Sequence, residues 1–432
     1  MSRPSVRSNA DFQSVPQAGA RLWWVSIAHC VVDFFSYIII PLVTVLQLSA
    51  YFTPKEDALL LGLGSIASGV IQPLTALWSD KHDTRWLGTA GAAVAAIAMT
   101  LIGYVDEFWM LLVLQGIGSA GVGAFHPVAA AAVGHLSGAR RARGVAMFYS
   151  AGMLGAIGAG FIMPQFVTHL GLKNVAWLMI PGLLTCIGLA WAIHGVPHRH
   201  ATARDEHRAL PADVRRRRWV DIGLLYASNV VRFVVNMMLV QLLIRWSEAR
   251  VLADHAAGAL TPDLRHEASE INGPLQAAMS IGMLIAGVVV GLIVKPRMEK
   301  PLLVWMPAAG AACIAAFPFV TSLDGPLGGV PMAFVFSVLG GIGYAGVVPI
   351  TISMAQRLLP HRTSLASGLM MGGAWAIAAI GPALAQQLYL RAGLTWSFVA
   401  VGAVLLVAVV LGAGVRHPDA PSSTGRETGA TR

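Results

Sequence analysis

Residues 108–136 read FWMLLVLQGIGSAGVGAFHPVAAAAVGHL, and this stretch decides the class of fold. It contains no Asp, Glu, Lys or Arg. It is also longer than the ~20 apolar residues that a helix needs to cross the hydrocarbon core of a bilayer. A run of this kind is typical of a membrane-spanning helix. The stretch carries a glycine-rich segment at 116–121 and the pair His126-Pro127.

The whole chain has the composition of a membrane protein. Of its 432 residues, 56% are hydrophobic and only 12% are charged, whereas a soluble domain carries about 25% charged residues. The formal net charge of +9 would favour nucleic-acid binding only if the basic residues shared one folded face. They form short clusters between apolar segments instead. We therefore predict a protein whose main partner is the lipid bilayer and which binds no nucleic acid.

Apolar windows bounded by charge, proline or glycine predict twelve membrane-spanning helices. The spans of the first half are 22–48, 58–79, 86–105, 108–136, 144–169 and 174–195. The spans of the second half are 219–246, 273–294, 301–321, 329–356, 363–390 and 394–415. The prediction is an all-α membrane protein with two six-helix bundles, 21–196 and 219–416. A basic cytoplasmic linker, 197–218, joins them, and the tails 1–20 and 417–432 are disordered.

Lysine and arginine are distributed unequally between the two sides of these spans. With the N-terminus in the cytoplasm, 23 of the 30 Lys and Arg residues fall on the cytoplasmic side and 6 on the other. This asymmetry obeys the positive-inside rule, and an odd number of spans would destroy it. We therefore predict that both termini are cytoplasmic. The longest loop on the other side is 247–272.

An internal repeat supports the division into halves. The segment GIGSAG at 116–121 is echoed by GIGYAG at 341–346, and a proline follows each, Pro127 and Pro349. Duplicated six-helix halves are an architecture of secondary transporters, whose substrate site lies between the halves near the middle of the membrane.

Three local patterns in the first half are more specific. They are Ala28-His29 followed by Asp33, Gln72-Pro73 followed by WSDK at 78–81, and the segment 116–127 that ends in AFHP. Together they resemble the major facilitator superfamily and, within it, the fosmidomycin-resistance type of efflux protein. The resemblance covers residues 21–165, and the second half matches only at the level of the superfamily. It implies a monomeric multi-pass transporter of a bacterial inner membrane, with helices one, four, seven and ten lining a central cavity.

Four ionisable residues stand inside predicted spans, namely His29, Asp33, His126 and Arg232. A charged side chain in the middle of a spanning helix costs about 2.5–3.5 kcal/mol on insertion scales, so that each requires a reason. Counted from the cytoplasmic ends of their spans, Asp33, His126 and Arg232 lie at a common depth of roughly 16–20 Å. We expect them to face one water-filled chamber.

We hypothesise that Asp33, His29 and His126 form a proton-binding group that couples transport to the proton gradient. His29 and Asp33 are four residues apart and so share one helical face. A carboxylate beside a cation stays ionised, and desolvation on a change of access favours its protonation. The alternative is a structural lock in which Asp33 pairs with Arg232 across the two halves.

Arg232 is also a candidate anchor for an anionic substrate. It stands between Asn229 and Asn236 on one helical face, and guanidinium and amide groups together suit a carboxylate, phosphate or phosphonate. The alternative is that it neutralises Asp33 and contacts no solute. Tyr344 and Trp375 are weaker candidates for the same cavity, because polar and aromatic residues in such spans more often make helix–helix contacts.

Asp80, Lys81 and Arg85 lie at the cytoplasmic edge of the second predicted span. The resemblance implies that this loop holds the inward end shut, so these residues form a candidate cytoplasmic gate. The alternative is a solvated charge pair at a helix end.

No catalytic or phosphate-binding motif occurs in the sequence, and the three cysteines show no ligand spacing. We therefore expect no enzyme, no cofactor and no metal. The predicted function is secondary transport of a small, anionic or phosphonate-like solute or drug, as proton-coupled efflux by alternating access. Uptake of an organic anion by the same fold, and a membrane sensor or scaffold that transports nothing, stay open as alternatives.

Overall fold

The computed structural model describes residues 16–50, 52–53, 56–79, 82, 84–137, 141–196, 211–323, 328–359 and 363–416. The chain is helical over these residues, and none of them lies in a β-strand. The helices and helical turns are α1 (Ala18–Tyr37), α2 (Ile39–Ser49), α3 (Asp57–Ser79), α4 (Arg85–Thr100), η2 (Leu101–Tyr104), α5 (Phe108–Leu136), α6 (Arg141–Leu170), η4 (Leu172–Leu178), α7 (Met179–Ile193), α9 (Ala212–Asp254), α10 (Pro262–Ile293), α11 (Pro296–Thr321), α12 (Gly329–Ala345), α13 (Val348–Leu358), α14 (Thr363–Gly368), η7 (Leu369–Gly373), α15 (Ala374–Ala378) and α16 (Gly381–Gly414).

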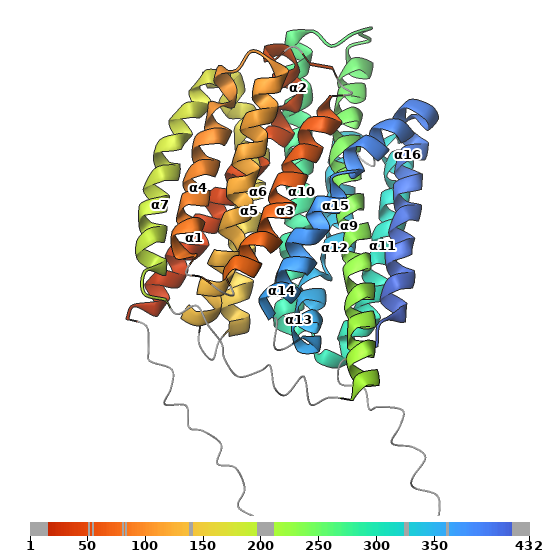
Figure 1. Ribbon diagram of the computed structural model, residues 1–432. Helices are drawn as coiled ribbons and strands as arrows, with labels where there is room; N and C mark the ends of the chain where they lie inside the picture. Colours follow the sequence, from red (N-terminus) through yellow and green to blue (C-terminus); the bar gives the residue numbers. More distant parts are fainter. Residues whose placement is uncertain are drawn as a thin grey trace, which may run out of the picture.

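Within the described ranges, 11 helices are long and apolar enough to cross a membrane. The last of them, Leu369–Gly414, has 46 residues and covers most of two predicted spans. Gly393 lies between those spans with φ 73° and ψ 177°, a conformation that glycine adopts at little cost because it has no Cβ. Figure 1 shows α16 turning at its upper end.

Two boundaries differ from the sequence prediction. The long external loop predicted at 247–272 is wrong, because α9 continues to Asp254 and α10 begins at Pro262. The side chain of Thr261 caps α10 by accepting a hydrogen bond from the Leu264 amide (3.4 Å). Polar residues can continue a helix beyond its apolar turns, and hydropathy alone misses such extensions. The second difference is at the start of α9, which begins inside the predicted linker at Ala212. The rest of the linker, 197–210, lies outside the described residues, as do 1–15 and 417–432 of the predicted tails.

Helices of the first half pack mainly with one another, as do helices of the second half. In the first half α1 packs on α6 and α7, and α5 packs on α3 and α4. In the second half α16 packs on α9 and α11, and α12 packs on α10 and α11. The two sets meet where α10 crosses α6 and α2 and where α3 lies against α15 and η7. Figure 1 shows the start of α1, the start of α9 and the end of α16 at the same end of the bundle.

The outer surface is apolar and the interior holds polar groups. Large hydrophobic side chains such as Leu292 (80% exposed), Val410 (72%) and Trp305 (71%) lie on the outside, while Asp57 and Arg232 are fully buried. Soluble proteins rarely expose large contiguous apolar patches. This distribution is that of a multi-pass membrane protein, with its hydrocarbon-facing side chains directed to lipid.

One close backbone approach between the two halves is made by two glycines. A Cβ on Gly160 of α6 would stand 2.6 Å from the carbonyl oxygen of Gly273 of α10, and a Cβ on Gly273 would meet the carbonyl oxygen of Gly160. Small residues at such a crossing allow helices to pack backbone against backbone in a membrane. No side chain fits between them.

We predict that Gly273→Ala destabilises the protein by about 1–3 kcal/mol, the usual cost of overpacking a tight contact. Gly223→Ala is the matched control, because a Cβ there meets nothing within 4 Å and alanine is the better helix former. Thermal unfolding of both variants in detergent checks the prediction. Equal melting temperatures for the two variants would contradict it.

Candidate functional site

His29, Asp33 and His126 form one compact cluster. His29 and Asp33 come from α1, and His126 comes from α5, whose packing against α1 brings it alongside them. The Nε2 atoms of the two histidines are 3.1 Å apart. The Asp33 carboxylate lies 3.3 Å from Nε2 of His29 and 3.2 Å from Nε2 of His126. The exposed fractions of the His29, Asp33 and His126 side chains are 3%, 7% and 14%.

Backbone carbonyls fix the tautomer of both rings. Nδ1 of His29 lies 2.7 Å from the carbonyl oxygen of Phe148, and Nδ1 of His126 lies 2.8 Å from that of Val122. A carbonyl oxygen only accepts, so each Nδ1 carries the proton and donates. In the neutral rings both Nε2 atoms are then acceptors that face each other and a carboxylate. An added cation is needed to satisfy the three groups together.

Helix α6 shapes the cluster from a third side. The ring of Phe148 stacks on His29 at 3.9 Å between centroids. A Cβ on Gly152 would stand 2.5 Å from both Oδ2 of Asp33 and Cε1 of His29. One turn further on, a Cβ on Gly155 would meet the carbonyl oxygen of Cys30. The glycines of α6 therefore let the cluster residues of α1 lie directly against its backbone.

Arg232 is held separately, in the second half. Its side chain is fully buried, its Nε donates to the carbonyl oxygen of Ser228 (3.2 Å), and its Nη2 donates to Oδ1 of Asn229. Its Nη1 has no hydrogen-bond partner. Asn229 in turn donates to the carbonyl oxygen of Met370 (3.1 Å), which lies in the π-helical turn η7. Such turns widen the helical hydrogen-bond pattern and occur often at functional sites.

The other candidates of the second half make contacts among themselves. The hydroxyl of Tyr344 donates to Oδ1 of Asn236 (2.8 Å), so Asn236 binds a tyrosine and not the guanidinium of Arg232. Trp375 stacks on Phe233, which follows Arg232 in α9, with 4.7 Å between ring centroids. These pairings are helix–helix contacts in the structure as it stands.

The lock between Asp33 and Arg232, which the sequence left open as an alternative, does not form. Throughout the described part of the chain, Arg232 makes no ion pair, and the ionic partners of Asp33 are the two histidines. The expected common chamber is also closed at these groups, because Arg232 is 0% and Asp33 5% exposed. Of the candidate cytoplasmic gate, Asp80 and Lys81 lie outside the described residues, and Arg85 is the first residue of α4.

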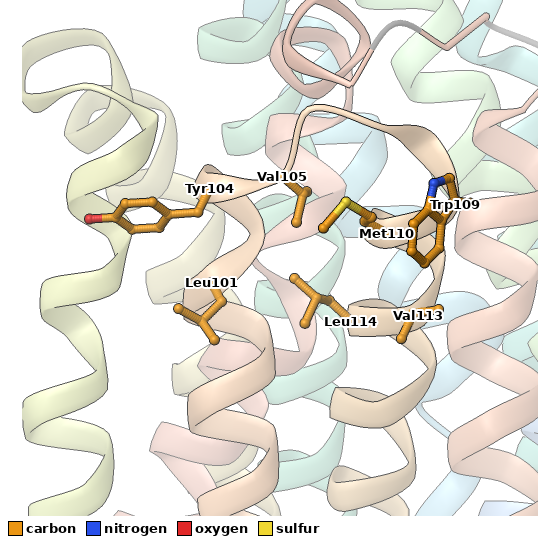
Figure 2. Close-up of a pocket in the computed structure, with 7 residues that line it drawn as sticks. All are labelled: Leu101, Tyr104, Val105, Trp109, Met110, Val113 and Leu114. Atoms are coloured by element: carbon orange, nitrogen blue, oxygen red, sulfur yellow. The ribbon is translucent and has the colours of Figure 1, made fainter.

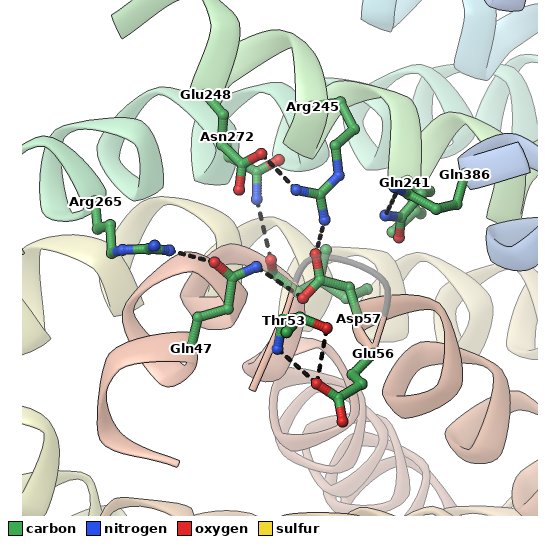
Figure 3. Close-up of polar contacts among 12 residues, drawn as sticks. Gln47, Thr53, Glu56, Asp57, Gln241, Arg245, Glu248, Arg265, Asn272 and Gln386 are labelled. Atoms are coloured by element: carbon green, nitrogen blue, oxygen red, sulfur yellow. Dashed lines mark hydrogen bonds and ion pairs between the residues drawn. The ribbon is translucent and has the colours of Figure 1, made fainter. Parts of the chain in front are cut away.

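A second polar cluster joins the halves at the end of the molecule opposite the start of α1 (Figure 3). Asp57, the first residue of α3, forms a fully buried ion pair with Arg245 of α9, and Arg245 also binds Glu248 (2.5 Å). Gln47 of α2 donates to Asp57 (2.8 Å) and accepts from Arg265 of α10. We call these five residues the outer cluster. Ser269 and Asn272 of α10 extend it by donating to backbone carbonyls at the junction of α1 and α2.

The sequence did not predict the outer cluster. Arg245 and Arg265 were counted only among the six Lys and Arg residues on the non-cytoplasmic side. A signal was present, since Arg245 and Glu248 stand three residues apart at the end of an apolar run, the spacing of an ion pair on one helical face. The partner Asp57 could not be found in this way, because nothing local relates the start of α3 to the end of α9.

One described pocket lies elsewhere. It has a volume of about 310 Å³ and is lined only by apolar and aromatic residues around the junction of α4, η2 and α5. Figure 2 shows these side chains, including Tyr104 and Trp109, both 59% exposed. None of the polar candidates contributes to it, so it does not mark the site.

We predict that Arg245→Gln destabilises the protein by about 3–5 kcal/mol, because it leaves the buried Asp57 carboxylate without its arginine partner. Asp57→Asn should cost less, because Glu248 still pairs with Arg245. The double variant should lose less unfolding free energy than the two single variants lose together. The control is the same set of single and double variants at the exposed pair Arg250–Asp254 of α9, where 40% of each side chain is exposed. The coupling free energy between these two residues should be less than about 1 kcal/mol. Unfolding in detergent measures both cycles, and additive losses at Asp57 and Arg245 would rule out the coupling.

The chain is similar to known proteins over most of its length. The family model of the Major Facilitator Superfamily matches residues 25–328 and 275–431. The chain is 22% identical over 360 residues to the fosmidomycin resistance protein of Escherichia coli (strain K12), covering 83% of this chain and 84% of that protein.

Solved structures give the same fold. A bacterial homologue of the human drug peptide transporters is similar with a TM-score of 0.66 at 14% identity, over 92% of this chain and 98% of that one. A bacterial homologue of the human lysosomal transporter Spinster, in an inward-facing and unoccupied conformation, gives 0.63 at 16% identity, over 93% and 97%. These matches, and above all the family model that spans most of the sequence, show that the chain belongs to the Major Facilitator Superfamily of transporters.

Proposed function

We propose that this transporter exports a small anionic solute, of the phosphonate or carboxylate class, in exchange for protons. The observation that carries the proposal is the guanidinium of Arg232, which is fully buried, has no acidic partner among the described residues and leaves Nη1 unbonded. An unpaired charge in such a place is costly to the folded protein. A bound anion would supply the missing partner.

The surroundings of Arg232 suit an oxyanion. The carbonyl oxygen of Ser228 accepts from Nε of Arg232, and Asn229, itself bound to the π-helical turn η7, accepts from Nη2, so that Nη1 stays available. A guanidinium can donate two parallel hydrogen bonds to a carboxylate or phosphonate, which a lysine ammonium cannot imitate. Tyr344, Asn236 and Trp375 belong to the same proposed site, where a solute would replace part of their present contacts.

The cluster of His29, Asp33 and His126 is the proposed proton-binding group. Its two ring acceptors and its carboxylate lie 3.1–3.3 Å apart with no proton donor between them in the neutral state of the rings. A proton bound there would let the two Nε2 atoms and the Asp33 carboxylate form hydrogen bonds in place of unfavourable contacts between acceptors. The cluster lies in the first half and Arg232 in the second, so the proton and the anion would bind opposite halves of one transporter.

Alternating access is the proposed transport cycle, and the outer cluster is its proposed outer gate. Asp57 and Gln47 belong to the first half, and Arg245, Glu248 and Arg265 belong to the second, so their contacts hold the two halves together at one end. Opening on that side would require these contacts to break. Asp80, Lys81 and Arg85 are proposed for the corresponding role at the cytoplasmic end.

The membrane arrangement completes the proposal. We take the two arms of the Leu369–Gly414 helix, on either side of Gly393, as separate spans, which makes twelve in two six-helix bundles. The protein would lie as a monomer in a bacterial inner membrane with both termini in the cytoplasm. The efflux direction is supported by the name of the Escherichia coli relative, a resistance protein.

We predict that Arg232→Lys lowers the affinity for the transported anion about 10–100-fold, since one charged hydrogen bond contributes about 1.5–3 kcal/mol. Growth of cells with and without the gene, across phosphonate antibiotics such as fosmidomycin and organic acids, selects the solute. Binding of that solute to purified protein is then measured for Arg232→Lys and for the control Arg250→Lys, an exposed arginine on the same helix. Equal affinities for the wild type and Arg232→Lys would exclude the anchor.

We predict that Asp33→Asn abolishes transport driven by a proton gradient and keeps part of the exchange of labelled for unlabelled solute. The amide has the size of the carboxylate but takes up no proton, so only the coupled step should fail. Proteoliposomes with and without an imposed pH gradient measure the two activities separately. Asp254→Asn, at an exposed position, is the control, and uphill transport by Asp33→Asn at the wild-type rate would refute the coupling role.

A further inference from the structure

We infer that His29, Asp33 and His126 also form a binding site for a divalent transition-metal ion of the zinc class. Each of the three residues offers a ligand atom, and these atoms all lie within 4.8 Å of one another. Two imidazoles and a carboxylate are a common ligand set for Zn²⁺, which leaves the fourth tetrahedral position for water. The inference goes beyond transport, and it rests on ligand geometry alone.

The spacing of the ligand atoms fits a small tetrahedral ion. Zinc binds nitrogen and oxygen at ~2.0–2.2 Å, which places neighbouring ligand atoms about 3.3–3.5 Å apart on the edges of the tetrahedron. Nε2 of His29 lies 3.1 Å from Nε2 of His126. Nε2 of His29 lies 3.3 Å from Oδ2 of Asp33, whereas Nε2 of His126 lies 3.2 Å from Oδ1. Each ring is therefore near the required separation from its own carboxylate oxygen, and with one carboxylate oxygen as the shared ligand the three atoms lie within 4.8 Å of one another.

The outer contacts of the rings are those of metal-binding histidines. Histidine ligands usually donate their second ring N–H to a carbonyl or carboxylate, which fixes the tautomer and aims the other nitrogen at the metal. Nδ1 of His29 and Nδ1 of His126 both do so, to the carbonyl oxygens of Phe148 and Val122. Both Nε2 atoms are thereby left as acceptors, 3.1 Å from each other and beside the Asp33 carboxylate.

The site has one side on which a fourth ligand can enter. His29 and Asp33 are almost completely covered, partly because Gly152 of α6 lies directly against them. His126 is the most exposed of the three, with 14% of its side chain accessible. An ion would therefore be held by three protein ligands and reached from the side of His126.

The test uses the full chain in detergent, freed of any polyhistidine tag and stripped with a chelator. Co²⁺ is the probe, because its four-coordinate complexes absorb strongly in the visible range. We expect one Co²⁺ per chain with such a spectrum and displacement by Zn²⁺. We also expect Asp33→Asn to bind at least about 100-fold more weakly, beyond the 10–100-fold typical of outer contacts. His255→Ala, which removes an exposed histidine elsewhere, should bind as the wild type does.

Two further variants test the position of the ion. His126→Cys should keep binding and add a thiolate-to-cobalt charge-transfer band in the near ultraviolet, which shows residue 126 on the metal. Gly152→Ala should weaken binding, whereas Gly158→Ala should not, because a Cβ at 158 makes only ordinary contacts of 3.6 Å or more. Absence of stoichiometric binding by the wild type, undiminished binding by Asp33→Asn, or binding by His126→Cys without the band overturns the inference.

The outcome is separable from the transport proposal. Loss of metal binding in Asp33→Asn together with intact uphill transport would keep the metal site and refute proton coupling. Coupled transport that fails in Asp33→Asn, with no Co²⁺ bound by the wild type, would refute the metal site and keep proton coupling. Anion binding at Arg232 is on another helix of the other half and is measured independently of both.

Discussion

The cost of placing charge in a medium without water governs this structure. Each ionisable group inside the bundle has to be neutralised by a neighbour or by something that binds. The protein meets this requirement in three ways. Asp57 and Arg245 neutralise each other, Asp33 is held between two histidines whose charge depends on a bound cation, and Arg232 is surrounded by neutral groups. The first arrangement is complete within the chain, and the other two call for an added ion.

We propose that the first of these arrangements serves structure and the other two serve transport. The Asp57–Arg245 pair connects α3 of the first half with α9 of the second half. It can therefore stabilise only the arrangement in which these two helix ends meet. The histidine cluster is built entirely within the first half and Arg232 entirely within the second. Each half therefore carries one charge site of its own, and the sites share no described ion pair. A motion of the halves can change the access to both without taking either site apart.

The sequence predicted what depends on local pattern. Three local motifs carried the resemblance to the family, and the long apolar runs placed spans such as 58–79 and 108–136 within a residue of α3 and α5. Helical spacing placed His29 and Asp33 on one face, and the structure brings His126 to them. Whether these residues bind protons stays a prediction. The alternative in which Asp33 pairs with Arg232 was wrong, since equal depth along separate helices does not fix the distance between their side chains.

What the sequence could not supply depends on contacts across the fold. The ion pair of Asp57 with Arg245 joins segments far apart in the chain, and hydropathy treats both as ends of spans. The break at Gly393 is likewise set by backbone conformation. Hydropathy windows record apolar length, whereas these features arise from tertiary packing and from single dihedral angles.

The crossing of α6 and α10 at Gly160 and Gly273 has a consequence for how this protein can vary. Where two side chains meet, enlargement of one can be offset by reduction of the other. Here both partners already have the smallest residue that exists, so no compensating exchange is available and any growth has to push the helices apart. Sequence changes that alter the substrate or the transport rate must therefore occur at other positions, while Gly160 and Gly273 stay glycine.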